Sequence, residues 1–210
     1  DGKLLAAAVE DDNSVVLVNT ASGKVLERIK DEGRNPELAV LSPDGRWIYV
    51  SAEEAQQVDV INVAERRQTA SIPVGKRPRG IVFLADGSRA YVACELAGKV
   101  YAIDVANQKV LAEINAGKFP NGLAAHPNGR QVFVSNGRDA TVMAIDTASN
   151  SIVATIEVGK RPWNMAITPD GRRLYVANGR SESVSVIDTE ALRRIADIGV
   201  GELPWGVVIR

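Results

Sequence analysis

The stretch "RPWNMAITPDGRRLYVANGRSESVSVIDT", residues 161–189, consists of two apolar runs around an Asp-Gly pair, followed by a third apolar run that ends in Ile-Asp. Nearly the same pattern occurs as "NPELAVLSPDGRWIYVSAEEAQQVDVINV" (35–63), "RPRGIVFLADGSRAYVACELAGKVYAIDV" (77–105) and "FPNGLAAHPNGRQVFVSNGRDATVMAIDT" (119–147). A repeat of this length is typical of stacked supersecondary units that bury a continuous core between neighbours.

The spacing of the copies is constant. Their turn residues are Asp44, Asp86, Asn128 and Asp170, separated each time by 42 residues, and a fifth copy starts 43 residues earlier at Asp1. Five copies fill the chain without a linker or a change of composition, so residues 1–210 are predicted to form a single domain.

Each copy reads as four β-strands. In the third copy, two β-rich runs flank Asp-Gly, which is the strongest short-range hairpin signal, and "KVYAID" and "KVLAEI" follow. The third strand has apolar residues at successive as well as alternate positions in every copy, so both of its faces are expected to be covered. The predicted fold is therefore all-β, a β-propeller of five four-stranded antiparallel blades.

The two ends of the chain predict how the ring closes. The segment "PWGVVIR" at the end corresponds to a first strand, and "LLAAA" near the start corresponds to the strand that would pair with it. Val207–Ile209 antiparallel to Leu4–Ala8 would remove the open sheet edge. The alternative is that the five blades are part of a longer ring.

Composition excludes some partners. The chain is 45% hydrophobic and 24% charged with a formal net charge of −1, as in an ordinary soluble globular protein. No basic excess favours nucleic acid, and the apolar runs are strand-sized, so no membrane span is expected. The chain is expected to be a monomer.

The motif "YVAN" at residues 175–178 and "FVSN" at 133–136, together with "SPDG", "TPDG", "SVSVIDT" and "VGKRP", resembles the YVTN-type β-propeller repeat over essentially the whole chain. The last two copies are most similar to the propeller proteins associated with PQQ-dependent alcohol oxidation in bacteria. The resemblance implies a periplasmic or otherwise exported protein that is non-catalytic.

Several conspicuous residues have ordinary structural interpretations. His126, the only histidine, lies beside a strand-connecting turn and is expected to be a turn residue rather than a ligand or catalyst. Cys94 is expected to be a packed, inert thiol. The recurring turn and strand-end aspartates are expected to accept local backbone N–H bonds. The acidic groups "EDDN" (10–13) and "EE" (53–54) are expected to form a solvated edge rather than a calcium loop.

The candidate site lies in the connections from the fourth strand of one blade to the first strand of the next, which reach the central axis. Just after the proline of each connection, the side chain varies: Glu37, Arg79, Asn121, Trp163 and Trp205. The two tryptophans are predicted to form one aromatic wall. Positive charge is added by Lys76, Arg77, Lys118, Lys160 and Arg161, with Glu37 and Glu202 expected on the other side. The alternative is that the tryptophans plug the ring and the charges are merely solvated.

Two classes of function fit these residues. The first is a non-catalytic scaffold whose axial face binds a partner protein or a small anionic ligand, with PQQ suggested by the resemblance, through Arg79, Asn121, Trp163, Trp205, Lys76, Arg77, Lys118 and Arg161. The second resembles metal-dependent gluconolactonases, with Glu37, Asn121 and Asn164 around a divalent ion such as calcium. The sequence favours the binding protein, because one carboxylate and two amides make a thin metal site.

Overall fold

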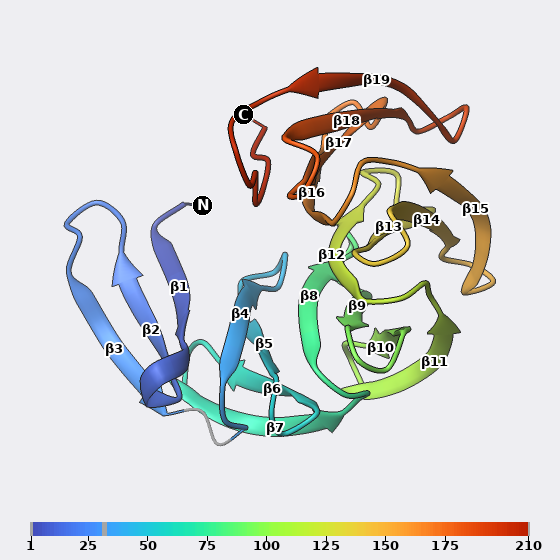
Figure 1. Ribbon diagram of the computed structural model, residues 1–210. Helices are drawn as coiled ribbons and strands as arrows, with labels where there is room; N and C mark the ends of the chain where they lie inside the picture. Colours follow the sequence, from blue (N-terminus) through green and yellow to red (C-terminus); the bar gives the residue numbers. More distant parts are fainter. Residues whose placement is uncertain (1, 31–32, 210) are drawn as a thin grey trace.

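The computed structural model describes residues 2–30 and 33–209, and it consists of antiparallel β-sheets arranged side by side around a common centre (Figure 1). Sheet 1 has three strands, β1 (Leu4–Val9), β2 (Ser14–Asn19) and β3 (Val25–Lys30), with a short 3-10 turn, η1 (Glu10–Asp12), between the first two. Sheets 2 to 5 have four strands each. This confirms the all-β prediction and is consistent with a β-propeller.

The strands of the four-stranded sheets follow one another in chain order. Sheet 2 contains β4 (Pro36–Leu41), β5 (Trp47–Ala52), β6 (Gln57–Asn62) and β7 (Arg67–Pro73). Sheet 3 contains β8 (Pro78–Phe83), β9 (Arg89–Cys94), β10 (Lys99–Asp104) and β11 (Lys109–Asn115). Sheet 4 contains β12 (Pro120–Ala125), β13 (Gln131–Asn136), β14 (Thr141–Asp146) and β15 (Ser151–Glu157). Sheet 5 contains β16 (Pro162–Ile167), β17 (Arg173–Asn178), β18 (Ser183–Asp188) and β19 (Arg193–Gly199).

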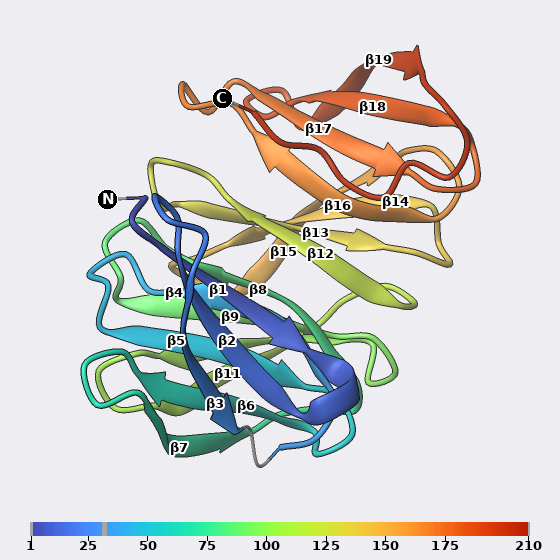
Figure 2. The same ribbon diagram turned by 90° about the vertical axis from the view of Figure 1, so that its left-hand side faces the viewer.

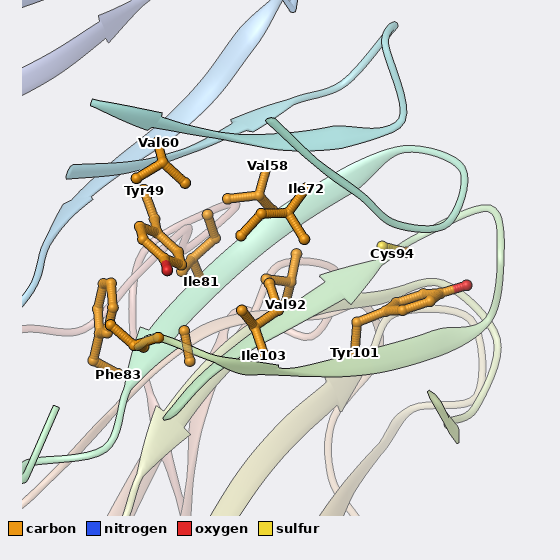
Figure 3. Close-up of a cluster of buried hydrophobic side chains, with 12 residues drawn as sticks. Tyr49, Val58, Val60, Ile72, Ile81, Phe83, Val92, Cys94, Tyr101 and Ile103 are labelled. Carbon is orange, nitrogen blue, oxygen red and sulfur yellow. The ribbon is translucent and has the colours of Figure 1, made fainter. Parts of the chain in front are cut away.

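The core lies between the sheets rather than inside any one of them, and Figure 2 shows the sheets layered face to face. Figure 3 shows Tyr49 and Val60 of sheet 2 meeting Phe83 and Ile103 of sheet 3, and all of them are buried. The Tyr49 and Phe83 rings meet edge to face with centroids 4.9 Å apart. The apolar third strands of sheets 2, 3 and 4 are thus covered on both faces, as predicted, whereas those of the two end sheets have a neighbour on one face only.

The predicted ring closure is wrong. Among the described residues β1 pairs only with β2, and residues 204–209 form no strand. Trp205 instead accepts a hydrogen bond from the Asn164 N–H at 3.3 Å, which places this segment beside β16. The five sheets complete only part of a circle (Figure 1), because side chains filling the wedge between neighbouring sheets set the turn from one to the next.

The two end sheets consequently each have an uncovered face. The equivalent isoleucines Ile29, Ile72, Ile114 and Ile156 are at most 5% exposed, whereas Ile198 of β19 is 48% exposed. Leu5 of β1 is 53% exposed, although its counterparts in the other four sheets are fully buried. No helix of the described chain is long and apolar enough to cross a membrane.

The tight turns have the predicted geometry. Gly45, Gly87, Gly129 and Gly171 all have φ between +71° and +76°. The turn side chains act as expected, since Asp44 accepts from the Arg46 N–H at 3.0 Å and Asn128 does the same for Arg130 at 2.9 Å. Asp1, the turn residue of the first copy, lies outside the described residues. Cys94 is fully buried, and burial raises its thiol pKa to about 12, which confirms an inert thiol.

Gly171→Ala should destabilise the protein more than Gly129→Ala. Both substitutions place a Cβ at positive φ, which costs about 1 kcal/mol. At Gly171 the added Cβ would also lie 2.5 Å from the His126 ring, whereas at Gly129 it would meet nothing within 4 Å. Urea unfolding measures the difference, and adding His126→Ala to each variant should remove it. Equal losses in the two single variants would contradict the structure.

The Asp44 turn should make stability pH-dependent below the ordinary aspartate pKa. Hydrogen bonds from the Ser42 hydroxyl and the Arg46 N–H, with the Arg46 charge, lower the pKa of Asp44 from 3.8 to about 2. Because the folded pKa is the lower one, the ionised turn stabilises folding above pH 3.8, and this contribution is lost as pH falls toward 2.

Asp44→Asn keeps the acceptor for the Arg46 N–H, as Asn128 does in its own turn, but removes the titration. The free energy of unfolding should therefore fall less in the variant than in the wild type between about pH 5 and about pH 2. An identical decrease in both proteins would show that the turn carboxylate does not contribute.

Candidate functional site

The connections between sheets place the variable residues on one end of the propeller, which we call the axial face. It comprises the residues around the inter-sheet prolines and the turns between second and third strands. In β4, β8, β12 and β16 the pairing register shifts just after the proline, so the variable residue lies in a bulge. Side chains in a regular strand point alternately to the two faces of the sheet, and the bulge interrupts this order at the variable residue.

The residue before each proline adds a second, unpredicted feature. Asn35, Arg77, Phe119, Arg161 and Leu203 all have positive φ, between +50° and +60°. This conformation costs energy for residues with a Cβ, and it also occurs at hairpin-turn residues elsewhere in the repeat, such as Gln56 and Gln108. The repeated left-handed residue brings Arg77, Phe119 and Arg161 into the same region as the variable positions.

Arg79 is the centre of a network of charges on the axial face. Its guanidinium lies 2.6 Å from Glu37, 3.2 Å from Glu53 and 3.1 Å from Glu95, and its side chain is only 17% exposed. Burial alone would lower the pKa of Arg79, but these three carboxylates raise it above its ordinary value. Arg79 therefore stays fully charged.

The network includes two further arginines. Arg77 pairs with Glu53 and lies 3.4 Å from Glu95, and the guanidinium of Arg161 reaches Glu95 from sheet 5 at 3.5 Å. Glu95 is 2% exposed in its side chain and contacts all three arginines. The charges are thus shared among sheets 2, 3 and 5.

An aromatic group adjoins the charges. The guanidinium carbon of Arg161 lies 5.8 Å from the Phe119 ring and 5.7 Å from the Trp163 ring, within cation–π range. The Trp163 and Trp205 rings meet edge to face with centroids 6.0 Å apart. This confirms the predicted aromatic wall, which runs from the arginines toward the end of the chain.

Two glycines make room for these side chains. A Cβ at Gly137 would come within 3.4 Å of the Arg161 guanidinium, and one at Gly179 within 3.4 Å of the Trp163 ring. These glycines occupy the repeat position that is Glu53 in sheet 2 and Glu95 in sheet 3. The same position therefore carries a carboxylate in sheets 2 and 3 and no side chain in sheets 4 and 5, where Arg161 and Trp163 lie beside it.

The structure brings together some predicted site residues and separates others. Arg77, Arg79, Arg161, Trp163 and Trp205 form the continuous group just described. Lys76 and Lys118 are exposed on the flanking loops, and Asn121 is half-buried on the neighbouring first strand. Lys76 also lines a cavity of about 260 Å³ between sheets 2 and 3, together with Glu53, Glu54, Gln56, Arg77 and Leu96.

Two sequence interpretations of the acidic residues are wrong. Glu37 was expected away from the basic loops, but it pairs with Arg79. Glu53 was expected to be solvated, but its side chain is 14% exposed and pairs with Arg77 and Arg79. Sequence analysis missed Glu95 altogether. The signal was the recurrence of Glu53 and Glu95 at one repeat position, directly after the second strand.

The metal site considered from the sequence does not fit the geometry. Its only carboxylate, Glu37, accepts from Arg79, which places a fixed positive charge where the cation would lie. Among the described residues no group of three His, Cys, Asp or Glu side chains could hold a metal ion.

Comparison with known proteins identifies the family. Residues 63–194 match the family model "Lactonase, 7-bladed beta-propeller". The chain belongs to this lactonase family. The family description specifies seven blades, whereas the described residues form five sheets. No curated protein sequence matches the chain.

Solved structures share the fold at low sequence identity. A functionally unknown protein from Desulfotomaculum acetoxidans superimposes with a TM-score of 0.90 at 18% identity, over 100% of this chain and 70% of that one. A putative 6-phosphogluconolactonase from Bacteroides uniformis gives 0.82 at 19%, over 97% and 70%. Kuenenia stuttgartiensis hydrazine synthase gives 0.73 at 19%, over 98% and 86%.

These findings correct the functional prediction. The chain was expected to be a non-catalytic scaffold accessory to PQQ-dependent oxidation, but the matching family is one of lactonases, and a fold neighbour is a putative 6-phosphogluconolactonase. The comparisons therefore favour the lactonase-like hydrolase that sequence analysis held as its alternative. The expectation of a non-enzyme is wrong on the same grounds.

Glu95→Gln should strongly destabilise the protein. Removing one charge from a buried network leaves guanidinium groups without a counter-charge, which typically costs about 3 kcal/mol. The matched control is Glu113→Gln, which breaks the solvent-exposed pair with Lys99 and should cost less than about 1 kcal/mol. Chemical denaturation measures both. A loss for Glu95→Gln no larger than that of the control would mean that the network is not held tightly.

Proposed function

We propose that the axial face hydrolyses a lactone. The observation that carries this proposal is the contact of Arg79 with Glu37, Glu53 and Glu95, which puts fixed guanidinium groups beside a carboxylate that borders a cavity. Hydrolysis of a cyclic ester needs a group that accepts a proton from water and a group that stabilises negative charge on the carbonyl oxygen. Membership of the lactonase family supports the same reaction.

Glu53 is the proposed general base. Its carboxylate lines the cavity of about 260 Å³ together with Arg77 and contacts both Arg77 and Arg79, so a water molecule held by Glu53 in the cavity would lie next to Arg77. The water oxygen would attack the carbonyl carbon of the lactone while its proton passes to Glu53. Arg77, which lines the cavity, would stabilise the oxyanion of the tetrahedral intermediate, and Arg79 would hold the Glu53 carboxylate in position.

The ring carbon–oxygen bond then breaks, and the proton on Glu53 passes to the leaving alkoxide, which yields the hydroxy acid. Glu95 is proposed as a positioning residue, since it is almost fully buried and holds Arg77, Arg79 and Arg161 in place. Leu96, which is exposed and lines the same cavity, offers an apolar surface for the body of the substrate. The YVTN-type subtype, the exported location and the monomeric state stay predictions.

Glu53→Gln and Arg77→Met should each lower kcat for hydrolysis of δ-gluconolactone, followed by acid release with a pH indicator. Loss of a general base or of an oxyanion donor typically costs about 100-fold or more. The control is Lys109→Ala, which removes an exposed charge on β11 and should leave the rate unchanged. Thermal unfolding of each variant verifies that the fold is retained.

Two results would contradict the proposal. One is absence of lactone hydrolysis by the wild type, and the other is full activity in Glu53→Gln. Hydrolysis that requires calcium and is lost in Glu37→Gln would reassign the reaction to the metal-dependent alternative.

A further inference from the structure

A recurring slot between neighbouring sheets lies at the end of the propeller opposite the axial face. One wall is the residue that begins the second strand of a sheet, and the other is the residue that follows the third strand of the next sheet. In the first two slots both walls are apolar. Leu4 and Val63 belong to one hydrophobic cluster, and Trp47 and Val105 belong to another. These slots are filled by the chain itself.

The third slot, between sheets 3 and 4, is filled by the positively charged side chain of Arg89. The guanidinium of Arg89 crosses to sheet 4 and donates to the carbonyl oxygen of Thr147. Next to it, the Tyr91 hydroxyl donates to Asn150 Oδ1 at 3.0 Å. A basic side chain and a hydroxyl therefore bridge these two sheets.

The fourth slot, between sheets 4 and 5, lacks both bridging groups. Gln131 stands where Arg89 does, and Phe133, which has no hydroxyl, stands where Tyr91 does. The counterpart of Thr147 is Thr189, and within residues 2–30 and 33–209 no side chain donates to its carbonyl oxygen. The shorter Gln131 leaves the slot open.

A cavity of about 690 Å³ occupies this fourth slot. Gln131 and Thr189 both line it, together with His126, Arg130, Asp146 and Glu190. Among the described residues, Asp146, Glu190 and Arg130 take part in no ion pair, so two carboxylates and one guanidinium of the cavity lack a counter-charge. Within the cavity wall, Arg173 is paired with Asp188 at 2.9 Å, and Arg172 lies 4.0 Å from Asp170.

We propose that this cavity binds a small organic cation carrying a guanidinium group. The preceding slot shows that a guanidinium fits between a second-strand start and the facing carbonyl, where its planar donors reach an acceptor. In the fourth slot Thr189, whose carbonyl oxygen is the counterpart acceptor, lines a cavity together with Asp146 and Glu190. The carboxylate of Asp146 accepts from the N–H and hydroxyl of Ser149 through Oδ1, at 2.8 and 2.7 Å, which leaves Oδ2 for a ligand. Carboxylates match the fork of a guanidinium in charge and in geometry.

His126 supplies the readout, because it is the only histidine and lines the cavity. Titration with ethylguanidinium should shift its ring proton resonances in a saturable way, and propylammonium should shift them less. Gln131→Arg restores the group that fills the preceding slot, so it should abolish this response and raise Tm. The control Ala64→Arg adds the same charge to an exposed turn of sheet 2 and should keep the response.

Asp146→Asn provides a second test that leaves the size of the cavity unchanged, and it should weaken ethylguanidinium binding by about 10-fold, the loss expected for one charge-assisted hydrogen bond. The proposal is overturned if ethylguanidinium does not shift His126, if Gln131→Arg responds like the wild type, or if sulfate shifts the resonances and ethylguanidinium does not. Sulfate binding alone would assign the cavity to anions through Arg130. Because the cavity lies at the other end of the sheets, none of these results bears on lactone hydrolysis.

Discussion

The structure depends on how closely the first strands of neighbouring sheets approach one another near the centre. A Cβ on Gly80 would lie 2.3 Å from the Asn121 carbonyl oxygen, and one on Gly122 would lie 2.5 Å from that of Trp163. Only glycine permits backbones to meet at this separation. The close approach brings the residues just before these glycines, Arg79 and Asn121, next to those of adjacent sheets. Side chains that are 42 residues apart in sequence thereby become one surface.

Much of the fold could be predicted because it depends on local chemistry. Asp-Gly turns, apolar third strands and a constant period specify hairpins that need a neighbour on each face, and the glycine φ values and the burial of Tyr49 and Ile103 bear this out. Closure could not be predicted in this way. The angle between sheets depends on the summed shape of side chains in the wedge, such as the Tyr49–Phe83 contact, and no short motif encodes it.

The grouping of the axial residues could be predicted, but their charge partners could not. Variation after the prolines indicated Arg79, Trp163 and Trp205, and the structure links them through Glu95 and Arg161. The acidic partners were missed, because an adjacent Glu-Glu pair ordinarily indicates a solvated turn. Glu53 and Glu95 are buried because they pair with arginines that come from later parts of the chain. Two of these arginines, Arg77 and Arg161, have a left-handed backbone conformation, which the sequence does not indicate at a residue other than glycine.

The charge network is better explained by function than by stability. Burying ionised groups costs desolvation energy, and the attraction between the groups often does no more than offset this cost. Well-packed apolar residues at the same positions would therefore stabilise the folded protein at least as well. Sheets 4 and 5 form the same four-stranded unit with Gly137 and Gly179 where sheets 2 and 3 have Glu53 and Glu95, so the carboxylates are not required by the fold. They are also confined to the part of the axial face that contains Arg79. A buried cluster of charges that the architecture does not need, set beside an aromatic wall, has the properties of a site organised for chemistry.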